Sequence, residues 1–224
     1  MPIPKSLIIA SSNSGKVREF RELLTIANLE VLPQPENFDV DETGITFAEN
    51  ARIKASAVAI ATGQWALADD SGLCVEALGG APGVHSARYG NTDLARIERL
   101  LAELEAINSA AQENINDTKL LAKREAYFVS ALAISDPSGT IRFQAEGRCN
   151  GSILKTPSGK EGFGYDPIFY VPELQKTFAE ISIDLKHKYG HRGKAIRELI
   201  HQFNKSQSKD KTEGLVENSY TPEK

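Results

Sequence analysis

The chain has 224 residues, of which 41% are hydrophobic and 25% are charged, and its formal net charge is −4. This length and composition are those of an ordinary globular protein that can bury a sizeable core. The acidic balance excludes a protein whose whole surface attracts DNA or anionic membranes, although it is compatible with a local basic cleft.

Two further features narrow the class of protein. The cysteines, Cys74 and Cys149, do not stand in a CxxC spacing, which argues against a disulfide framework and against a structural zinc site. No apolar stretch is long enough for a signal peptide or a membrane span. We therefore expect a cytoplasmic protein whose partners include neither nucleic acid nor a membrane.

The first predicted unit is a strand, a polar loop and a helix. Residues 7–10 form an uninterrupted apolar run, which is typical of a strand buried on both faces. Residues 11–15 are turn or N-cap types, and apolar residues then recur at helical spacing over 17–27. Lys16 therefore falls in the first turn of the predicted helix.

The next units are a helix, a strand and another helix. The sequence Thr-Phe-Ala-Glu at 46–49 has the spacing of a capping box, which predicts a helix that ends near Thr62. Residues 65–68 predict a buried strand that ends at the Asp-Asp-Ser-Gly sequence of 69–72. Leucine and isoleucine residues at helical spacing predict a helix over 94–104.

A polar loop and a hairpin follow. Residues 108–119 are polar and lack periodicity, which predicts a surface loop. Residues 127–134 predict a strand and residues 136–139 a turn. Apolar and polar residues alternate over 141–146, which predicts a second strand with one solvated face and completes a β-hairpin.

The last predicted element is an amphipathic helix over 195–203. From residue 205 onward the chain is rich in Ser, Lys, Glu and Asp, which predicts one domain over 1–204 and a disordered tail over 205–224. Because strand–loop–helix units and a hairpin both occur, we expect an α/β fold with a mixed central sheet.

The first candidate site is the polar loop before the first helix. Such a loop presents backbone N–H groups and partial positive charge, and Lys16 adds a full charge, so it suits a phosphate chain. It is not a Walker A loop, because the first glycine is absent and Val17 replaces the magnesium-binding Ser or Thr. An ordinary helix N-cap with a solvated lysine has the same pattern.

Carboxylates make the second candidate site. Asp69 and Asp70 follow a predicted strand, and α/β sheets bind ligands beyond the carboxyl ends of their strands. Adjacent carboxylates repel each other unless a cation or hydrogen bonds hold them, and magnesium suits such oxygen ligands and substrate phosphates. Glu42 is a candidate second ligand. A capping aspartate and a solvated loop carboxylate are the alternatives.

Two later segments are also candidates. Residues 162–167 combine glycines, two aromatics and an aspartate, which suits a loop that stacks on a flat ligand; a bulged hairpin with its aromatics in the core is the alternative. His191 and Arg192 open the last predicted helix, five and six residues after Lys186. Basic groups oppose the dipole there, so a phosphate or a polar base edge would explain them; a solvated basic face is the alternative.

These segments, in this order, resemble the non-canonical purine nucleoside triphosphate pyrophosphatases, the family of the inosine triphosphate pyrophosphatases. The resemblance extends over about 7–203 and is carried by six segments. They are Ser/Thr-x-Asn-x-x-Lys at 11–16, Glu-Thr-Gly-x-Thr-Phe-x-Glu-Asn-Ala at 42–51, Ala-Asp-Asp-Ser-Gly-Leu at 68–73, Gly-Gly-Ala-Pro-Gly at 79–83, Ser-Ala-Arg-Tyr at 86–89 and Phe-Gly-Tyr-Asp-Pro at 163–167.

The chain departs from the family pattern in two places. Gly190 stands where the family usually has a serine, which removes one hydroxyl beside His191 and Arg192 and bears on base affinity. The polar segment 108–119 is longer than usual, which bears on the surface and not on the chemistry.

The resemblance implies a two-lobed, elongated α/β fold, with the nucleotide in a cleft between the lobes, and a homodimer. It implies Mg²⁺ as the cofactor, held by Asp70 and Glu42, with Asp70 also the general base for the attacking water. A carboxylate close to a metal should have a lowered pKa. The residues implied to bind substrate are Ser11, Ser12, Asn13, Ser14, Gly15, Lys16, Lys54, Ser71, Phe163, Gly164, Tyr165, Asp166, Lys186, His191 and Arg192.

The implied function is the hydrolysis of inosine, deoxyinosine and xanthosine triphosphates to the monophosphate and pyrophosphate, which cleanses the nucleotide pool. One alternative is a related pyrophosphatase that acts on modified pyrimidine or methylated guanine nucleotides. Another is a nucleotide-binding module without turnover. The acidic net charge and the carboxylates beside a phosphate loop weigh against this second alternative.

Overall fold

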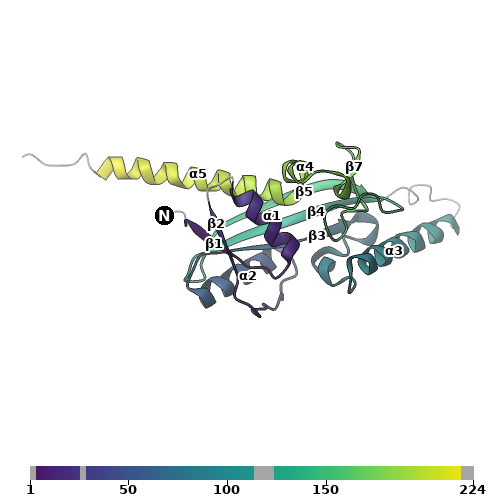
Figure 1. Ribbon diagram of the computed structural model, residues 1–224, viewed down its shortest axis with the longest axis horizontal. Helices are drawn as coiled ribbons and strands as arrows, with labels where there is room; N and C mark the ends of the chain where they lie inside the picture. The colour runs from purple at the N-terminus through teal and green to yellow at the C-terminus, as the bar shows by residue number, and fades with distance from the viewer. Residues whose placement is uncertain (1–3, 26–28, 114–123, 218–224) are drawn as a thin grey trace, which may run out of the picture.

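The computed structural model describes residues 4–25, 29–113 and 124–217, and its centre is one seven-stranded sheet in the order β2-β1-β3-β4-β5-β6-β7 (Figure 1). β1 is parallel to β2 and β3, whereas every pair from β3 to β7 is antiparallel, so the predicted mixed sheet is confirmed. The strands are β1 Ser6–Ile9, β2 Glu30–Pro33, β3 Ala66–Val75, β4 Glu125–Ser135, β5 Ile141–Ile153, β6 Phe169–Val171 and β7 Lys176–Thr177.

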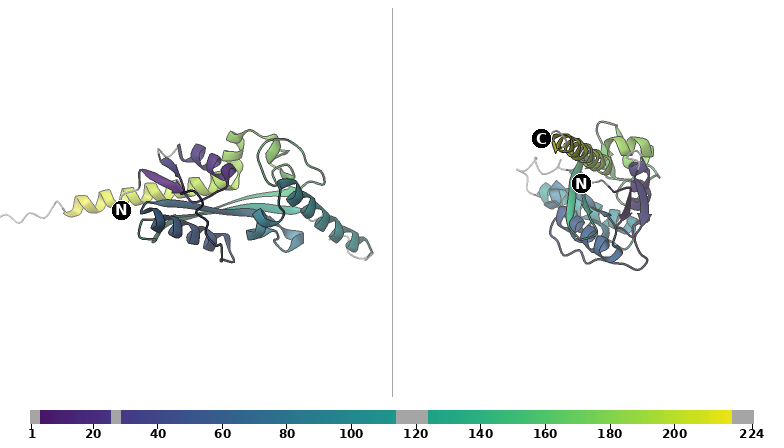
Figure 2. Two further views of the ribbon diagram at one scale, coloured as in Figure 1. Left: turned by 60° about the horizontal axis from the view of Figure 1, so that its bottom comes forward. Right: turned by 90° about the vertical axis from the view of Figure 1, so that its left-hand side faces the viewer.

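Helices cover both faces of this sheet. α1 (Ser14–Thr25) and α5 (His191–Glu217) lie on one face, and α2 (Phe47–Thr62) lies on the other (Figure 2). α3 (Asp93–Glu113) and α4 (Ile183–Tyr189) lie toward the end of the sheet that carries β6 and β7. Within the described ranges, no helix combines the length and the apolar character needed to cross a bilayer.

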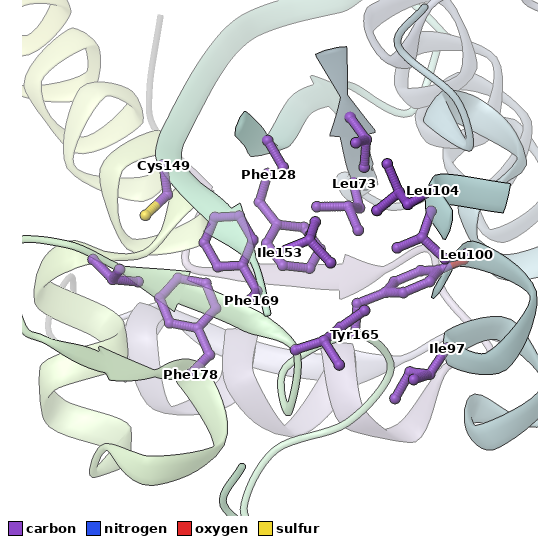
Figure 3. Close-up of a cluster of buried hydrophobic side chains, with 14 of the residues drawn as sticks. Leu73, Ile97, Leu100, Leu104, Phe128, Cys149, Ile153, Tyr165, Phe169 and Phe178 are labelled. Carbon is purple, nitrogen blue, oxygen red and sulfur yellow. The ribbon is translucent and has the colours of Figure 1, made fainter. Parts of the chain in front are cut away.

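Buried apolar side chains form three clusters, which account for an elongated, two-lobed shape. Two clusters lie at one end of the sheet on its opposite faces, one beneath α1 and α5 and the other beneath α2. The third lies at the other end, where Leu100 and Leu104 of α3 meet Phe128 and Phe169 of the sheet (Figure 3). The long strands β3, β4 and β5 join the two ends.

Local sequence signals explain why α2 begins and ends where it does. The Thr46 hydroxyl accepts the N–H of Glu49, and the Glu49 carboxylate accepts the N–H of Thr46, so the predicted capping box is present. At the other end, Gly63 has a φ of 64°, which is the left-handed conformation that favours glycine. The predicted helix is therefore confirmed at both ends.

The predicted hairpin is also confirmed. The Asp136 carboxylate accepts the N–H groups of Ser138 and Thr140, which closes the turn between β4 and β5. Arg142, Gln144 and Glu146 of β5 are exposed and alternate with less exposed apolar residues. The apolar face of β5 is the face on which α5 packs.

The contact between β5 and α5 is unusually close. A Cβ atom at Gly147 would lie 2.1 Å from the carbonyl oxygen of His191 and 2.4 Å from the amide nitrogen of Ala195. Only a residue without a side chain therefore allows the first turn of α5 to rest on this strand. That turn carries Arg192, which belongs to the candidate site.

The prediction that the strand beginning at residue 65 ends at residue 68 is wrong. β3 continues to Val75, and residues 69–72 pair with 129–132 of β4. The hydrogen bonds from β4 outweigh the low strand propensity of Asp, Ser and Gly. β1 ends at Ile9, opposite Leu67, so both aspartates still lie just beyond the carboxyl end of the neighbouring parallel strand.

Two segments are more helical than predicted. α3 continues to Glu113, so residues 108–113 are not a loop; residues 114–119 lie outside the described residues. α5 continues to Glu217, so residues 205–217 are helical and not a disordered tail, and 218–224 lie outside the described residues. These two segments lack an apolar stripe, which argues against their burial but not against a helix. A helix that has already formed can be extended without the unfavourable nucleation step.

We expect Thr46→Ala to lower the free energy of unfolding by about 1 kcal/mol, because the Glu49 N–H loses its side-chain acceptor at the start of α2. Urea denaturation measures this change. Thr46→Ser keeps the hydroxyl and should stay within about 0.5 kcal/mol of the parent protein. Equal losses in the two variants would contradict the role of the hydroxyl as a cap.

Candidate active site

A polar cleft of about 550 Å³ opens at the carboxyl end of β1. The loop between β1 and α1 forms one wall, and the Asn13 side chain caps α1 by accepting the N–H of Lys16 at 3.0 Å. Four of the predicted loop residues line the cleft, namely Ser11, Ser12, Asn13 and Lys16. Ser14 is exposed in the first turn of α1, and Gly15 lines a neighbouring cavity.

Lys54 joins the two predicted metal ligands at this cleft. Its Nζ lies 2.6 Å from Glu42 Oε1 and 3.1 Å from Asp70 Oδ1, and it donates to the carbonyl oxygen of Asp69 at 3.0 Å. Lys54 comes from α2, Glu42 from the segment before α2 and Asp70 from β3. The two carboxylates therefore contact one cation, the ammonium group of Lys54. Arg88, which sequence reasoning did not select, forms a second ion pair with Glu42.

These residues fit a divalent cation that shares its ligands with a substrate. Carboxylate oxygens suit Mg²⁺, which is usually held by one or two carboxylates together with water and substrate phosphates. Over the described ranges, no group of three or more His, Cys, Asp or Glu residues is placed to hold a metal alone. The donor set of Glu42 and Asp70 matches the shared mode of binding.

Asp70 is buried and each of its oxygens accepts a hydrogen bond. Lys54 donates to Oδ1, and Asn50 donates to Oδ2 at 3.2 Å. Burial raises the pKa of Asp70 above its ordinary value, although the charges of Lys54 and Lys16 act in the opposite direction. This direction applies to the site without a metal ion, so the lowering that a neighbouring metal charge would cause stays a prediction.

Asp69 points to the other face of β3 and has a different environment. It accepts hydrogen bonds from Ser130 at 2.6 Å and Ser71 at 2.8 Å, and Lys16 Nζ lies 2.9 Å from its Oδ2. Burial alone would raise its pKa, but Lys16, Arg192 and the Ser130 hydroxyl hold the pKa of Asp69 well below its ordinary value. The same burial lowers the pKa of Lys16.

The predicted basic residues near the last helix are buried, so the solvated-face alternative is wrong. Arg192 Nη1 lies 2.7 Å from Glu19 Oε2, and its Nη2 donates to Ser71 Oγ at 2.8 Å. Lys186 Nζ lies 2.6 Å from Asp166 Oδ2 and 3.8 Å from Glu19 Oε1. Internal carboxylates therefore balance these charges at the N-terminus of α5.

Glu19 is the acid that sequence reasoning missed. It lies on the buried side of α1 with Phe20 and Leu23, where a charged residue requires a partner. Burial would raise its pKa, but the charges of Arg192 and Lys186 lower it below its ordinary value. The sequence did contain one signal, because Glu19 stands four residues before Leu23 and therefore on the same side of the predicted helix.

The two aromatics of the 162–167 loop have different positions. Phe163 is partly buried, and its ring lies near Gly15, where a Cβ atom would be 2.9 Å from the ring. The Lys186 ammonium lies 4.8 Å from the centroid of that ring. Tyr165 belongs to the core, and its hydroxyl donates to the carbonyl oxygen of Ser86 at 3.0 Å. The core alternative is therefore correct for Tyr165, whereas stacking of Phe163 on a ligand stays a prediction.

Two cavities flank the Phe163 ring. One of about 320 Å³ is lined by Gly15, Glu19 and Lys186, among others. The other, of about 60 Å³, adjoins the polar cleft because Asn13 and Lys16 line both spaces. The remaining predicted residues at this second cavity are Ser71, Gly164, Tyr165, Asp166, His191 and Arg192.

His191 lines the second cavity and has a buried nitrogen without a hydrogen-bond partner in the described part of the chain. Its ring stacks on Phe128 with a centroid distance of 4.7 Å, and its buried Nδ1 has no hydrogen-bond partner among the described residues. Burial, with the charges of Arg192 and Lys186, holds the pKa of His191 well below its ordinary value, so the ring is neutral.

Gly190 has little room for the serine that the resemblance led us to expect. A Cβ atom there would lie 2.5 Å from the carbonyl oxygen of Lys186. The Gly190 N–H donates to the same oxygen at 2.7 Å. The glycine is therefore matched to the close approach of the chain to the last turn of α4, which it caps.

The chain is similar to known proteins over most of its length. The model of the Ham1 family matches residues 7–202. A dITP/XTP pyrophosphatase of Prochlorococcus marinus is 52% identical over 206 residues, which cover 89% of this chain and 95% of the relative. A dITP/XTP pyrophosphatase of Nostoc sp. is 53% identical over 196 residues, which cover 88% of this chain and 93% of the relative.

Solved structures share the same architecture. A HAM1 protein from Coxiella burnetii has a TM-score of 0.76 and 40% identity, and the match covers 90% of this chain and 100% of that protein. The Staphylococcus aureus Ham1 protein has a TM-score of 0.74 and 39% identity, with the same coverage. With a family model that spans most of its length and relatives above 50% identity, the chain belongs to the Ham1 family.

Proposed function

We propose that the chain hydrolyses non-canonical purine nucleoside triphosphates, namely inosine, deoxyinosine and xanthosine triphosphates, to the monophosphate and pyrophosphate. The observation that carries the proposal is the continuity of two different spaces. Asn13 and Lys16 line both the polar cleft of Glu42 and the smaller cavity of Phe163 and His191. A triphosphate suits the first space. The second space, of about 60 Å³, presents the Phe163 ring and buried hydrogen-bond donors, which suit one edge of a base. Relatives above 50% identity are dITP/XTP pyrophosphatases.

In the proposed reaction, water attacks the α-phosphorus and pyrophosphate leaves. Asp70 accepts the proton of the water as the new P–O bond forms and the bond to the β-phosphate oxygen breaks. The buried carboxylate is held by hydrogen bonds from Lys54 and Asn50, so its fixed position suits this role. Lys16 and Lys54 neutralise charge on the phosphate oxygens.

Mg²⁺ is part of this proposal, with Glu42 and Asp70 as the residues that would hold it. When bound, the ion neutralises charge on the phosphate oxygens in the transition state. The protein supplies the carboxylates in fixed positions, because Lys54 and Asn50 hold Asp70 from two sides.

Base preference is proposed to depend on hydrogen-bond donors around the Phe163 ring. Hypoxanthine and xanthine carry a 6-oxo acceptor where adenine carries an amine donor. The buried Lys186 and Arg192 offer only donors, so adenine would place a donor against a donor and leave both unsatisfied. Guanine also has the 6-oxo group, so its exclusion must involve the 2-position.

The assembly and the location of the protein are proposed from the family resemblance, as a homodimer in the cytoplasm. Cys74 and Cys149 are both buried free thiols, which suits a reducing compartment.

The first test is pyrophosphate release from four nucleotides. With Mg²⁺, we expect rapid release from inosine and xanthosine triphosphates and at least about 100-fold lower kcat/KM with adenosine triphosphate, because a buried donor mismatch is costly. Guanosine triphosphate should also be a poor substrate. Excess chelator should abolish release. Release of single phosphate, or equal use of all four nucleotides, would contradict the proposed function.

The second test is Asp70→Asn, which removes the proposed base and keeps the side-chain shape. We expect kcat with inosine triphosphate to fall by about 10²–10⁴-fold, the usual contribution of a general base. Thermal melting should show a folded protein. Asp184→Asn makes the same change at an exposed residue of α4 that lines neither the polar cleft nor the two cavities beside Phe163, and it should keep kcat within about two-fold. Near-parental turnover by Asp70→Asn would exclude Asp70 as the base.

A further inference from the structure

We propose that Asn50 is a positioning residue, which ties the segment that carries Glu42 to the Asp70 carboxylate. The proposal rests on the proposed function, because it assigns Asn50 to the geometry of that reaction and not to contact with the substrate. Asn50 lies in the first turn of α2 and is 1% exposed. It lines none of the three spaces around the site.

The two ends of the Asn50 amide have separate partners. Its Oδ1 accepts the N–H of Gly44 at 2.8 Å, and its Nδ2 donates to Asp70 Oδ2 at 3.2 Å. The Gly44 N–H can only donate and an ionised carboxylate can only accept, so one orientation of the amide satisfies both contacts. Rotation of the amide would break both hydrogen bonds, and the buried side chain is therefore locked.

The segment before α2 is seated directly on Asn50. A Cβ atom at Gly44 would lie 2.7 Å from Asn50 Oδ1 and 2.6 Å from the Cβ of Glu49, so the backbone has no room to shift inward. The Glu49 carboxylate accepts the next two N–H groups, those of Ile45 and Thr46. Three successive N–H groups are therefore held by two side chains, and Glu42 stands two residues before the first.

Asn50 consequently sets the relation between the two carboxylates. Asn50 donates a hydrogen bond to Oδ2 of Asp70. The other oxygen of Asp70, Oδ1, accepts a hydrogen bond from Lys54, which also pairs with Glu42. A neutral amide suits this place. It orients the carboxylate without adding a charge that competes with a cation for it. A base and its partner carboxylate must be held closely, because small displacements of reacting groups cost large factors in rate.

The test uses Asn50→Asp in the full-length protein. Aspartate keeps an acceptor for the Gly44 N–H but replaces the donor to Asp70 with a second carboxylate oxygen. We expect kcat for pyrophosphate release from inosine triphosphate to fall at least about 30-fold. At saturating Mg²⁺, we expect KM to change less than three-fold. The affinity for the non-hydrolysable α,β-imido analogue, measured by calorimetry at the same Mg²⁺ concentration, should also change less than three-fold.

The matched control is Thr46→Ala, which weakens the same turn of α2 and leaves the contact between Asn50 and Asp70 in place. It should lose melting temperature but keep kcat within two-fold at a temperature where both variants are folded. Asn50→Ala serves as the second variant. It should also lose kcat, and it replaces Asn50→Asp in the comparison if the aspartate variant does not fold.

Three outcomes decide the proposal. A large loss of kcat with preserved analogue affinity, absent in Thr46→Ala, supports it. Near-parental kcat in a folded Asn50 variant overturns it, and so does a loss that only parallels the loss of folded protein, because Asn50 would then be structural. If the parental protein releases no pyrophosphate from inosine triphosphate, the proposed function itself fails, and calorimetry with the analogue identifies that case separately.

Discussion

The alternation of side chains along β3 determines where the charged groups of the site stand. Consecutive residues of a strand point to opposite faces of the sheet, so Asp69 faces α1 and α5 whereas Asp70 faces α2. Each carboxylate meets a lysine from a helix on its own face, Lys16 for Asp69 and Lys54 for Asp70. Two adjacent aspartates, which would repel each other in a shared space, thus have separate environments and opposite shifts in pKa.

The face of Asp69 holds a chain of buried charges that has a cost in stability. Buried ion pairs lose hydration and often add little net stability, so their presence beside a cavity calls for another benefit. Arg192 bridges Asp69 and Glu19, and Lys186 connects Glu19 with Asp166. These pairs link α1, the 162–167 loop, α4 and α5. They hold hydrogen-bond donors in position before a ligand arrives, so little reorganisation is needed during binding.

Most of the fold was predictable from short sequence patterns. The contacts among the site residues were not, because they join residues that lie far apart in the sequence. The capped helix and the hairpin follow from spacing and turn chemistry within a few residues. The continuation of β3 through Asp69 and Asp70 needed pairing with β4, about 60 residues later, which no local propensity records. Family motifs placed most predicted residues around connected cavities. They did not indicate Glu19, whose partner Arg192 is 173 residues away, nor the two-sided role of Asn50.

Gly147, which lies beneath the first turn of α5, bears on how substitutions can alter such an enzyme. Gly147 lies on a strand and lines none of the cavities described at the site, yet its missing side chain sets how deeply the first turn of the helix rests against the sheet. Any larger residue would lift that turn and with it the guanidinium that reaches Asp69. If Arg192 contributes to base preference as proposed, that preference can be altered from outside the pocket, and a search for altered selectivity that samples only ligand-lining positions would overlook Gly147.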